Sequence, residues 1–399
     1  MKLTVKLRVV GGFSVITLLL LFIGLTAYTQ LSGISKSTAE VNTISIPALE
    51  NSALMKSEFV LMSKISLQAF NAQEQSQITA LRQQFNTEQQ AYQTAASQLN
   101  TAVQQQQTLA GAAQQVNLAY DAFIPLSNQL FEQLEQNLRS QNEIDDKLSE
   151  LEMTADDMAA LLLDFTDISN VRNRFPQAYQ AATQMETGIN SLLSVVVDLN
   201  RTTNDSTATT ISNDIAFRLQ DLATQLSVML REASQVSMPA DLEEKLTIVN
   251  SLLDTNQGIP GTKAKLLAGK ERANQLLLQA DEQTALALTR LDALLNQSTQ
   301  VATTIQDESQ KSVSNAVIAI FVVMLISTLV AVFIAYRTVT AIVKPLGKIN
   351  AMLGIVASGD LTQQLNDRSQ DEFGELSRNI NKVNQSLQQL IQGIISRST

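Results

Sequence analysis

Charged side chains that interrupt apolar helical stripes are the residues of this sequence best suited to hold a ligand. Glu58 stands between Leu54, Leu61 and Ile65 at a spacing that puts all four on one helix face. A carboxylate is costly to bury alone, so Glu58 should meet a cation or hold a raised pKa. Arg290, beside another apolar stripe, is the expected partner. Glu58 then either helps to shape a ligand pocket, or belongs to a structural salt bridge or a locally rotated helix.

Five further polar residues are candidate ligand contacts. Glu88 occupies a similar stripe position in the next helical stretch, and Asn137 and Gln141 interrupt a third stripe. These three could line a second cavity, or they could simply fix the packing register of the helices. Arg172 and Arg174 lie just before an expected helix start, where they could grip a carboxylate or remain in solvent.

The composition excludes several kinds of chemistry. The chain has 399 residues with no His, no Cys and no Trp. It therefore lacks the usual ligands of zinc, iron–sulfur and haem sites, and the Ser-His and Cys-His pairs of nucleophilic catalysis. We predict no enzyme activity, no metal and no cofactor. Only 14 Gly and 6 Pro interrupt the sequence, which favours long helices and an all-α fold.

Two uncharged apolar runs, residues 9–28 and 316–336, are long enough to cross a bilayer of roughly 30 Å. The first run is longer than the core of a usual signal peptide and lacks a small-x-small cleavage pattern, so we predict an uncleaved anchor. Basic residues before the first run and after the second predict cytoplasmic ends and an exported middle. These basic residues are Lys2, Lys6, Arg8, Arg337, Lys344 and Lys348.

The predicted exported part is strongly acidic. Residues 31–313 contain 33 acidic and 18 basic residues, which gives this part a net charge of −15. A field of that sign disfavours nucleic acid and anionic lipid headgroups as partners. An anionic ligand would therefore need a local cluster of Arg or Lys.

Turn signals predict how the exported helices are laid out. Signals near 104–111 and 256–261 predict long helices over 112–166 and 262–313, both running back toward the membrane. Each outgoing leg is broken, the first near residues 72–73 and the second near residues 204–206 and near Pro239. This pattern predicts an elongated bundle of two four-helix modules stacked end to end. Glu58 falls in the membrane-proximal module, and the polar residues that interrupt later stripes fall in the distal one.

The C-terminal region carries the most specific motif. Two short helical stretches with apolar seams at three- and four-residue spacing are joined by an extended connector. Such seams cannot be buried within one chain, whereas a parallel dimer would bury all of them in a four-helix bundle. The residues of this motif are Pro345, Leu346, Ile349, Gly359, Asp360, Leu361, Glu372, Phe373, Gly374 and Leu376.

At these positions, residues 338–391 resemble the HAMP signal-relay domain. Together with the two spans, the whole chain is similar to bacterial methyl-accepting chemotaxis receptors that have a helical bimodular sensor domain. The resemblance implies a homodimer in the bacterial inner membrane with its sensor domain in the periplasm. It implies a small-molecule ligand, an organic acid or an amine, or else a periplasmic binding protein. The resemblance also implies that such a receptor controls a cytoplasmic kinase through an adaptor protein.

The resemblance has one departure at the expected ligand site. Receptors of this kind that bind organic acids use Arg on the helices that here carry Glu58 and Arg290. The first of these helices has Lys56 and Lys64 instead, and both project away from the face that holds Glu58. Recognition of a simple dicarboxylate is therefore not the expectation.

Two alternatives to a chemoreceptor stay open. One is the sensor half of a membrane histidine kinase, and the other is a purely structural membrane coiled coil. A His-containing dimerisation helix beyond Thr399 would favour the kinase. The predicted segments are a cytoplasmic N-terminus (1–8), spans (9–30 and 314–337), a periplasmic sensor domain (31–313), a HAMP domain (338–391) and the start of a truncated signalling stalk (392–399).

Overall fold

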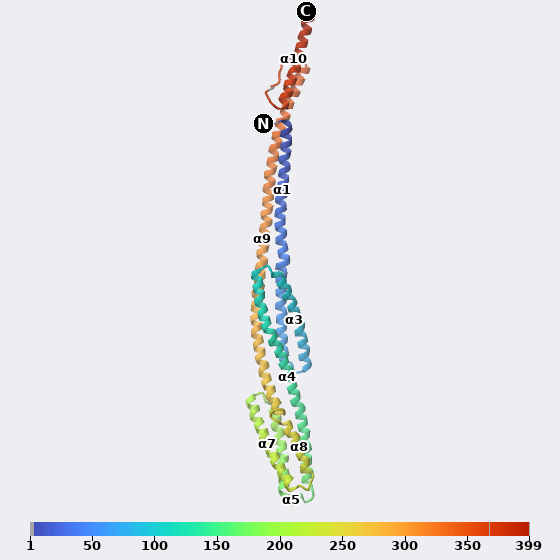
Figure 1. Ribbon diagram of the computed structural model, residues 1–399, viewed down its shortest axis with the longest axis vertical. Coiled ribbons are helices and arrows are strands. Elements are labelled where there is room, and N and C mark those ends of the chain that lie inside the picture. Colours follow the sequence, from blue (N-terminus) through green and yellow to red (C-terminus); the bar gives the residue numbers. More distant parts are fainter. Residues whose placement is uncertain (1–3, 367, 399) are drawn as a thin grey trace. The chain divides into compact units, whose positions relative to one another are not determined.

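The structure, a computed structural model, describes residues 4–366 and 368–398. Every regular element in these residues is a helix, which confirms the predicted all-α class. Lys2 and Thr399, which the sequence interpretation used, lie outside the described residues. The helices in Figure 1 are α1 (Val5–Glu40), η1 (Val41–Ser45), α2 (Ile46–Phe70), α3 (Gln75–Val103), α4 (Gln107–Thr166), α5 (Val171–Arg174), α6 (Pro176–Arg201), α7 (Asp205–Glu232), α8 (Met238–Leu252), α9 (Ile259–Ala357) and α10 (Glu372–Ser398).

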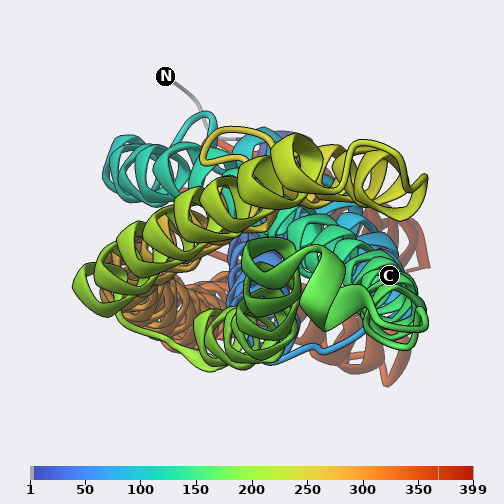
Figure 2. The same ribbon diagram turned by 90° about the horizontal axis from the view of Figure 1, so that it is seen from below.

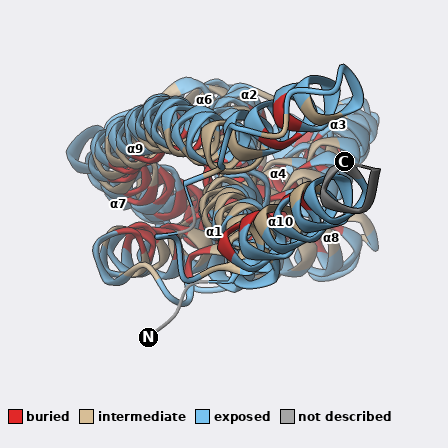
Figure 3. Ribbon diagram, turned by 90° about the horizontal axis from the view of Figure 1, so that it is seen from above, coloured by how far each residue is buried: buried red, intermediate tan, exposed pale blue. Residues whose placement is uncertain are grey.

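The chain folds as two compact units. One unit comprises residues 46–300, and the other comprises residues 1–45 together with 301–399. Helix α9 contributes residues to both of them. In the helices of residues 46–300, buried residues lie along one side and exposed residues along the other, as the colours of Figure 3 show. This one-sided burial is what the apolar stripes of the sequence predict.

Helix α4 runs in the direction opposite to the prediction. The Phe59 and Phe123 ring centroids are 4.7 Å apart, and the hydroxyls of Ser66 and Ser127 are 3.5 Å apart, so α4 is parallel to α2. The break near residue 72 is therefore a full reversal, and α3 is the segment that returns along α2 (Figure 1). The two helices have 25 and 29 residues, so each can cover the apolar face of the other along its whole length.

The first core of unit 46–300 is an aromatic bundle, formed by α2, α3, the first half of α4 and the 270–300 part of α9. Phe59, Phe85, Phe123 and Phe131 are fully buried and lie ring against ring, with centroids 4.7 to 6.2 Å apart. Aromatic pairs at such distances add to the free energy gained from burial alone.

The second core is an aliphatic bundle, formed by the second half of α4, α6, α7, α8 and the first residues of α9. Figure 2 shows these helices packed side by side. Pro176 is the first residue of α6, where its missing N–H costs little. The predicted breaks near Asn204 and Pro239 are confirmed as helix boundaries, because the Asn204 side chain accepts a hydrogen bond from the Thr207 N–H and caps α7.

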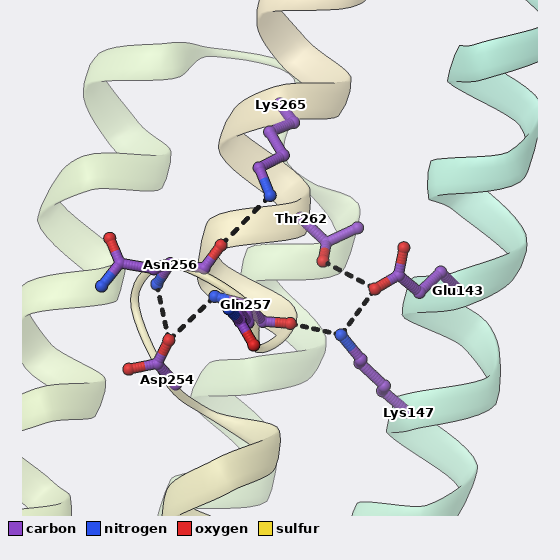
Figure 4. Close-up of polar contacts among 7 residues, drawn as sticks. All are labelled: Glu143, Lys147, Asp254, Asn256, Gln257, Thr262 and Lys265. Atoms are coloured by element: carbon purple, nitrogen blue, oxygen red, sulfur yellow. Dashed lines mark hydrogen bonds and ion pairs between the residues drawn. The ribbon is translucent and has the colours of Figure 1, made fainter.

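The predicted turn before the last long helix is confirmed, although α9 already begins at Ile259. Asp254 accepts hydrogen bonds from the backbone N–H groups of Asn256 (2.9 Å) and Gln257 (2.8 Å), which lower the pKa of its carboxyl group. Lys147 of α4 bonds to the Gln257 carbonyl, so α4 holds the turn in place. Figure 4 shows these contacts with Glu143, Thr262 and Lys265.

The second unit contains the two helices that could cross a membrane by length and composition. These helices are α1 and the 301–357 part of α9. Both continue without interruption through residues 30 and 313, so the predicted limits of the spans are not marked by helix ends. Helix α9 also continues through Pro345, and α4 continues through Pro125.

We predict that Phe123→Ala lowers the free energy of unfolding by about 3–5 kcal/mol, because it removes a fully buried ring from the centre of the aromatic bundle. The matched control is Phe217→Ala, whose ring is 72% exposed and whose removal should change stability by less than about 0.5 kcal/mol. Denaturant titrations of the full chain in detergent, followed by far-UV circular dichroism, measure both. Equal losses would contradict the placement of Phe123 in the core.

Candidate functional site

The buried face of α2 differs from the predicted one. Its core residues are Met55, Phe59 and Met62, all fully buried, whereas Leu54 is 45% exposed. The apolar stripe is therefore turned by about one residue, because the large Phe59 ring fills the space beside Phe123. Glu58 consequently lies at the edge of the core rather than in its middle.

Glu58 and Glu88 form a carboxyl pair between α2 and α3. Burial raises the pKa of Glu58, and the hydrogen bond to Glu88 and the charge of Glu88 raise it further. The negative charge of Glu88 opposes ionisation of Glu58, so the pair favours the protonated form of Glu58. The prediction that Glu88 lies in a different module from Glu58 is thus wrong, because α3 folds back along α2.

Arg290 is not the partner of Glu58, contrary to the prediction. Its guanidinium group donates a 2.7 Å hydrogen bond to the Gln115 carbonyl at the start of α4. The cation that does link α2 to α9 is Lys56, which forms an ion pair with Asp292. The Glu58 Oε2 atom is buried and has no hydrogen-bond partner among the described residues.

Asn137 and Gln141 lie where α4 passes α6 and α9, in a polar layer that also holds a buried lysine. Gln141 donates to Asp145 (3.1 Å) and to Asn200 (3.4 Å), and Asn137 accepts from Gln133. Lys263 is only 3% exposed, and its ammonium group donates a 2.7 Å hydrogen bond to the Asn200 carbonyl. The layer does not include Glu88, which lies with Glu58.

Sequence reasoning missed Lys263 and the hydroxyl group of Tyr92. Burial lowers the pKa of Lys263, and the nearby Lys270 lowers it further. Tyr92 stands in the apolar stripe of α3, next to Glu88 along the helix face. A lysine two positions after Gly261 gives no sequence signal of burial. A tyrosine in an apolar stripe does give a sequence signal of a buried polar group, because its hydroxyl needs a hydrogen-bond partner.

Arg172 and Arg174 lie in and around the short helix α5, as the sequence predicts, and both contact neighbouring side chains. Arg172 lies over the Tyr179 ring at 5.8 Å from its centroid. Arg174 lies over Phe175 at 5.0 Å and donates a 3.1 Å hydrogen bond to Gln235. These contacts hold both cations at the surface of the turn.

The connector between α9 and α10 is held against α10 by side-chain amides. Gly359 has φ +93°, a conformation that glycine adopts easily, and it ends α9. Asp360 accepts from the backbone and the hydroxyl of Thr362, which lowers the pKa of its carboxyl group. The Leu361 carbonyl accepts from Asn384 (3.0 Å) and from Gln388. The predicted turn residues therefore dock on the second helix.

The start of α10 is tied to the start of α1 within the same unit. Asp371 accepts from the Gly374 N–H (3.1 Å) as a helix cap, and its carboxylate lies 3.3 Å from the Arg8 guanidinium. Glu372 accepts a 2.7 Å hydrogen bond from the backbone N–H of Val5. A Cβ atom at Gly374 would overlap the Ser369 carbonyl, so only glycine fits there.

The apolar seam of α10 is largely exposed in a single chain. Val383 is 58% exposed, and Leu376 and Leu390 are also exposed, whereas polar Ser377 and Asn384 of the opposite face are buried. In α9, Leu346 is exposed and Ile349 is buried. Phe373 is half-buried beside Pro345 in one cleft of the unit. The exposed seam has the form that the sequence predicts for a surface covered by a second chain.

We predict that Glu58→Gln raises the melting temperature of the full chain at pH 7. The folded-state pKa of Glu58 lies above its unfolded value, so its favourable contribution is complete at low pH and is lost as the pH rises through the folded-state pKa. The gain from the substitution should therefore shrink as the pH falls below about 4. Glu282→Gln, at an exposed position of α9, is the control. Equal shifts for both variants would contradict the paired state of Glu58.

Comparison with known proteins places this architecture. Residues 337–389 match the HAMP domain family, which confirms the predicted domain at 338–391. Methyl-accepting chemotaxis protein TlpB of Bacillus subtilis (strain 168) is 25% identical over 203 residues, covering 45% of this chain and 30% of that protein. The match thus spans less than a third of the relative's length.

Among solved structures, the crystal structure of the TorS sensor domain–TorT complex in the presence of TMAO superposes with a TM-score of 0.48 and 12% identity. It covers 63% of this chain and 99% of that chain. The HAMP match and the chemotaxis-protein relative are therefore the two findings that describe this chain. The chain contains a HAMP domain, is similar over 203 residues to a methyl-accepting chemotaxis protein, and has, among its described residues, two helices long and apolar enough to cross a membrane.

Proposed function

We propose that this protein is a transmembrane chemoreceptor that senses a small periplasmic ligand and relays the signal to a cytoplasmic kinase-control module. The observation that carries the proposal is helix α9, whose residues 259–300 belong to one unit and whose residues 301–357 belong to the other. The first part packs in the ligand-sensing unit, and the second part contains the second span and the first HAMP helix. A single helix then serves as the signal path.

The proposed signal is a small displacement of this helix. Ligands commonly shift packed helices by about 1–2 Å, and an unbroken hydrogen-bonded helix passes such a shift along its axis. The HAMP unit would receive it at Ile349 and Met352, which are buried against their own chain. The connector amides and the Arg8–Asp371 pair would then readjust.

The orientation follows from charge. Lys6 and Arg8 precede the first span, and Arg337 and Lys344 follow the second, which favours both ends in the cytoplasm. Residues 46–300 would then lie in the periplasm of a cell with an inner membrane.

Two exposed apolar stripes support a parallel homodimer. The seam of α10 is one, and the other lies on α2, where Ile46, Ala53, Val60 and Leu67 repeat every seven residues and all face solvent. A seven-residue repeat is the spacing by which parallel helices pair. A second chain in parallel would cover each stripe with its own copy of that stripe.

Disulfide trapping at Val60 tests the dimer. The chain has no cysteine, so Val60→Cys introduces a single thiol at the centre of the α2 stripe. We expect covalent dimers in native membranes after mild oxidation, because a paired stripe brings the two Cα atoms within about 7 Å. Leu278→Cys, at an exposed site on α9, is the control and should remain monomeric on gels. Equal trapping of both variants, or none at position 60, would contradict the stripe pairing.

The alternative function is the sensor half of a membrane histidine kinase, which could sense through a periplasmic binding protein. Exposed Phe217 on α7 and exposed Met153 and Leu163 on α4 favour a protein partner for the aliphatic bundle. Such apolar side chains are the kind that a docked protein covers. A pull-down with purified periplasmic proteins, compared between the native chain and Phe217→Ser, would detect this partner.

A cysteine scan across the two spans tests signal transmission. Gly11→Cys, where no side chain lies within contact distance, is combined in turn with single cysteines at residues 333–338 of α9. Disulfide rates are then measured in membranes with and without each member of a panel of organic acids and amines that stabilise the full chain thermally. We expect that a bound compound moves the fastest disulfide formation to a cysteine one or two residues further along α9. Identical rates with every stabilising compound would contradict displacement of the helix.

A further inference from the structure

A cleft of about 450 Å³ lies between the C-terminal part of α3 and the N-terminal part of α4 in the aromatic bundle. Its walls include Tyr92, Gln93 and Asn100 from α3 and Asn117, Tyr120 and Asp121 from α4. This volume falls within the range of small-molecule pockets. The cleft is separate from the Glu58–Glu88 pair, since neither of those residues lines it.

The cleft contains a buried donor without a partner. Tyr92 is 1% exposed, and its hydroxyl has no hydrogen-bond partner among the described residues. Its ring stacks on Tyr120 with centroids 4.2 Å apart and planes 5° apart. The Tyr120 hydroxyl, by contrast, accepts a 3.1 Å hydrogen bond from Gln93. An unpaired buried hydroxyl costs stability, and a ligand atom at this wall would remove that cost.

The charge of the cleft selects the ligand. Asp121 is the only charged residue among those that line it, and the other polar groups are amides and hydroxyls. No Lys or Arg lines the walls, so an organic acid would meet a carboxylate without a counter-charge. The stacked rings of Tyr92 and Tyr120 are only 1% and 8% exposed, which leaves hydrogen bonds rather than cation–π contacts for recognition.

We propose that this cleft binds a small hydrogen-bonding molecule that carries a primary ammonium group. The ammonium group pairs with Asp121, and an oxygen of the ligand accepts a hydrogen bond from the Tyr92 hydroxyl. Amides such as Asn100 and Asn117 bond the remaining polar atoms. The inference deepens the proposed sensing function, on which its biological meaning rests, by naming the class of ligand.

Fluorine NMR of the full chain in lipid nanodiscs tests the inference. The chain has five tyrosines, so labelling with 3-fluorotyrosine gives few resonances, and Tyr92→Phe identifies that of Tyr92. The probes are glucosamine and ethanolamine, with glucose and glucuronate as the neutral and acidic counterparts of glucosamine. We expect at least one amine to shift the Tyr92 and Tyr120 resonances at millimolar concentration or below. The proposal would be overturned if no amine shifted the Tyr92 and Tyr120 resonances. It would also be overturned if glucose and glucuronate bound as tightly as glucosamine.

Two variants locate the binding groups. Tyr92→Phe should weaken binding of the amine about tenfold, measured by calorimetry, while leaving stability unchanged or higher, because it removes an unpaired hydroxyl. Asp121→Asn should abolish the preference for glucosamine over glucose. Tyr179→Phe, in the aliphatic bundle, is the matched control and should bind normally. Unchanged affinity in both Tyr92→Phe and Asp121→Asn would contradict the site.

The outcomes separate this inference from the signalling proposal. Amine binding that leaves the span disulfide rates unchanged would sustain the site and contradict signal transmission. Span rates that respond to other compounds, without any effect of the amines on Tyr92, would sustain transmission and contradict the site.

Discussion

The structure depends on the continuity of one helix, α9, which runs from Ile259 to Ala357. Its first part buries Leu276, Leu291 and other apolar residues in the unit formed by residues 46–300, and its later part provides the second candidate span and the first helix of the HAMP domain. Every turn of an α-helix is fixed by hydrogen bonds to the turns before and after it. A change of packing along the first part therefore has a mechanical route to the last.

The unit formed by residues 46–300 buries several polar or ionisable groups on α2, α3 and α9. Burial and the neighbouring Glu88 raise the pKa of Glu58, Lys263 is buried, and the Tyr92 hydroxyl has no partner among the described residues. Such groups lower the stability of the unliganded form, and a ligand or a proton that satisfies them changes the balance between packing states. The core cluster of the aliphatic bundle is apolar, so it offers few polar groups that a ligand or a proton could satisfy.

Sequence periodicity predicted the parts of this fold that depend on local pattern. The seam of α10, the turn before α9 and the start of α6 at Pro176 follow from residue spacing and turn chemistry. The direction of α4 could not be predicted in this way, because a break such as that near residue 72 can bend a helix or reverse the chain. The matching lengths of α2 and α3 decide between a bend and a reversal. The position of Glu58 relative to the core was also not predicted correctly. Two apolar stripes one residue apart exist on α2, and packing of the Phe59 ring decides which of them is buried. The Glu58–Glu88 contact depends on both of these, so the sequence named the residues and missed their pairing.

The most direct test of the account is to interrupt α9 between its two parts and measure the HAMP helices. Spin labels at Gln389→Cys, an exposed position of α10, report the distance between the two chains of a dimer in nanodiscs. The account predicts that a ligand bound to residues 46–300 changes this distance distribution in the native chain. It predicts no change after three glycines are inserted following Glu308, although the ligand still binds. A response that survives the insertion, or a native chain that binds ligand without any response, would contradict the account.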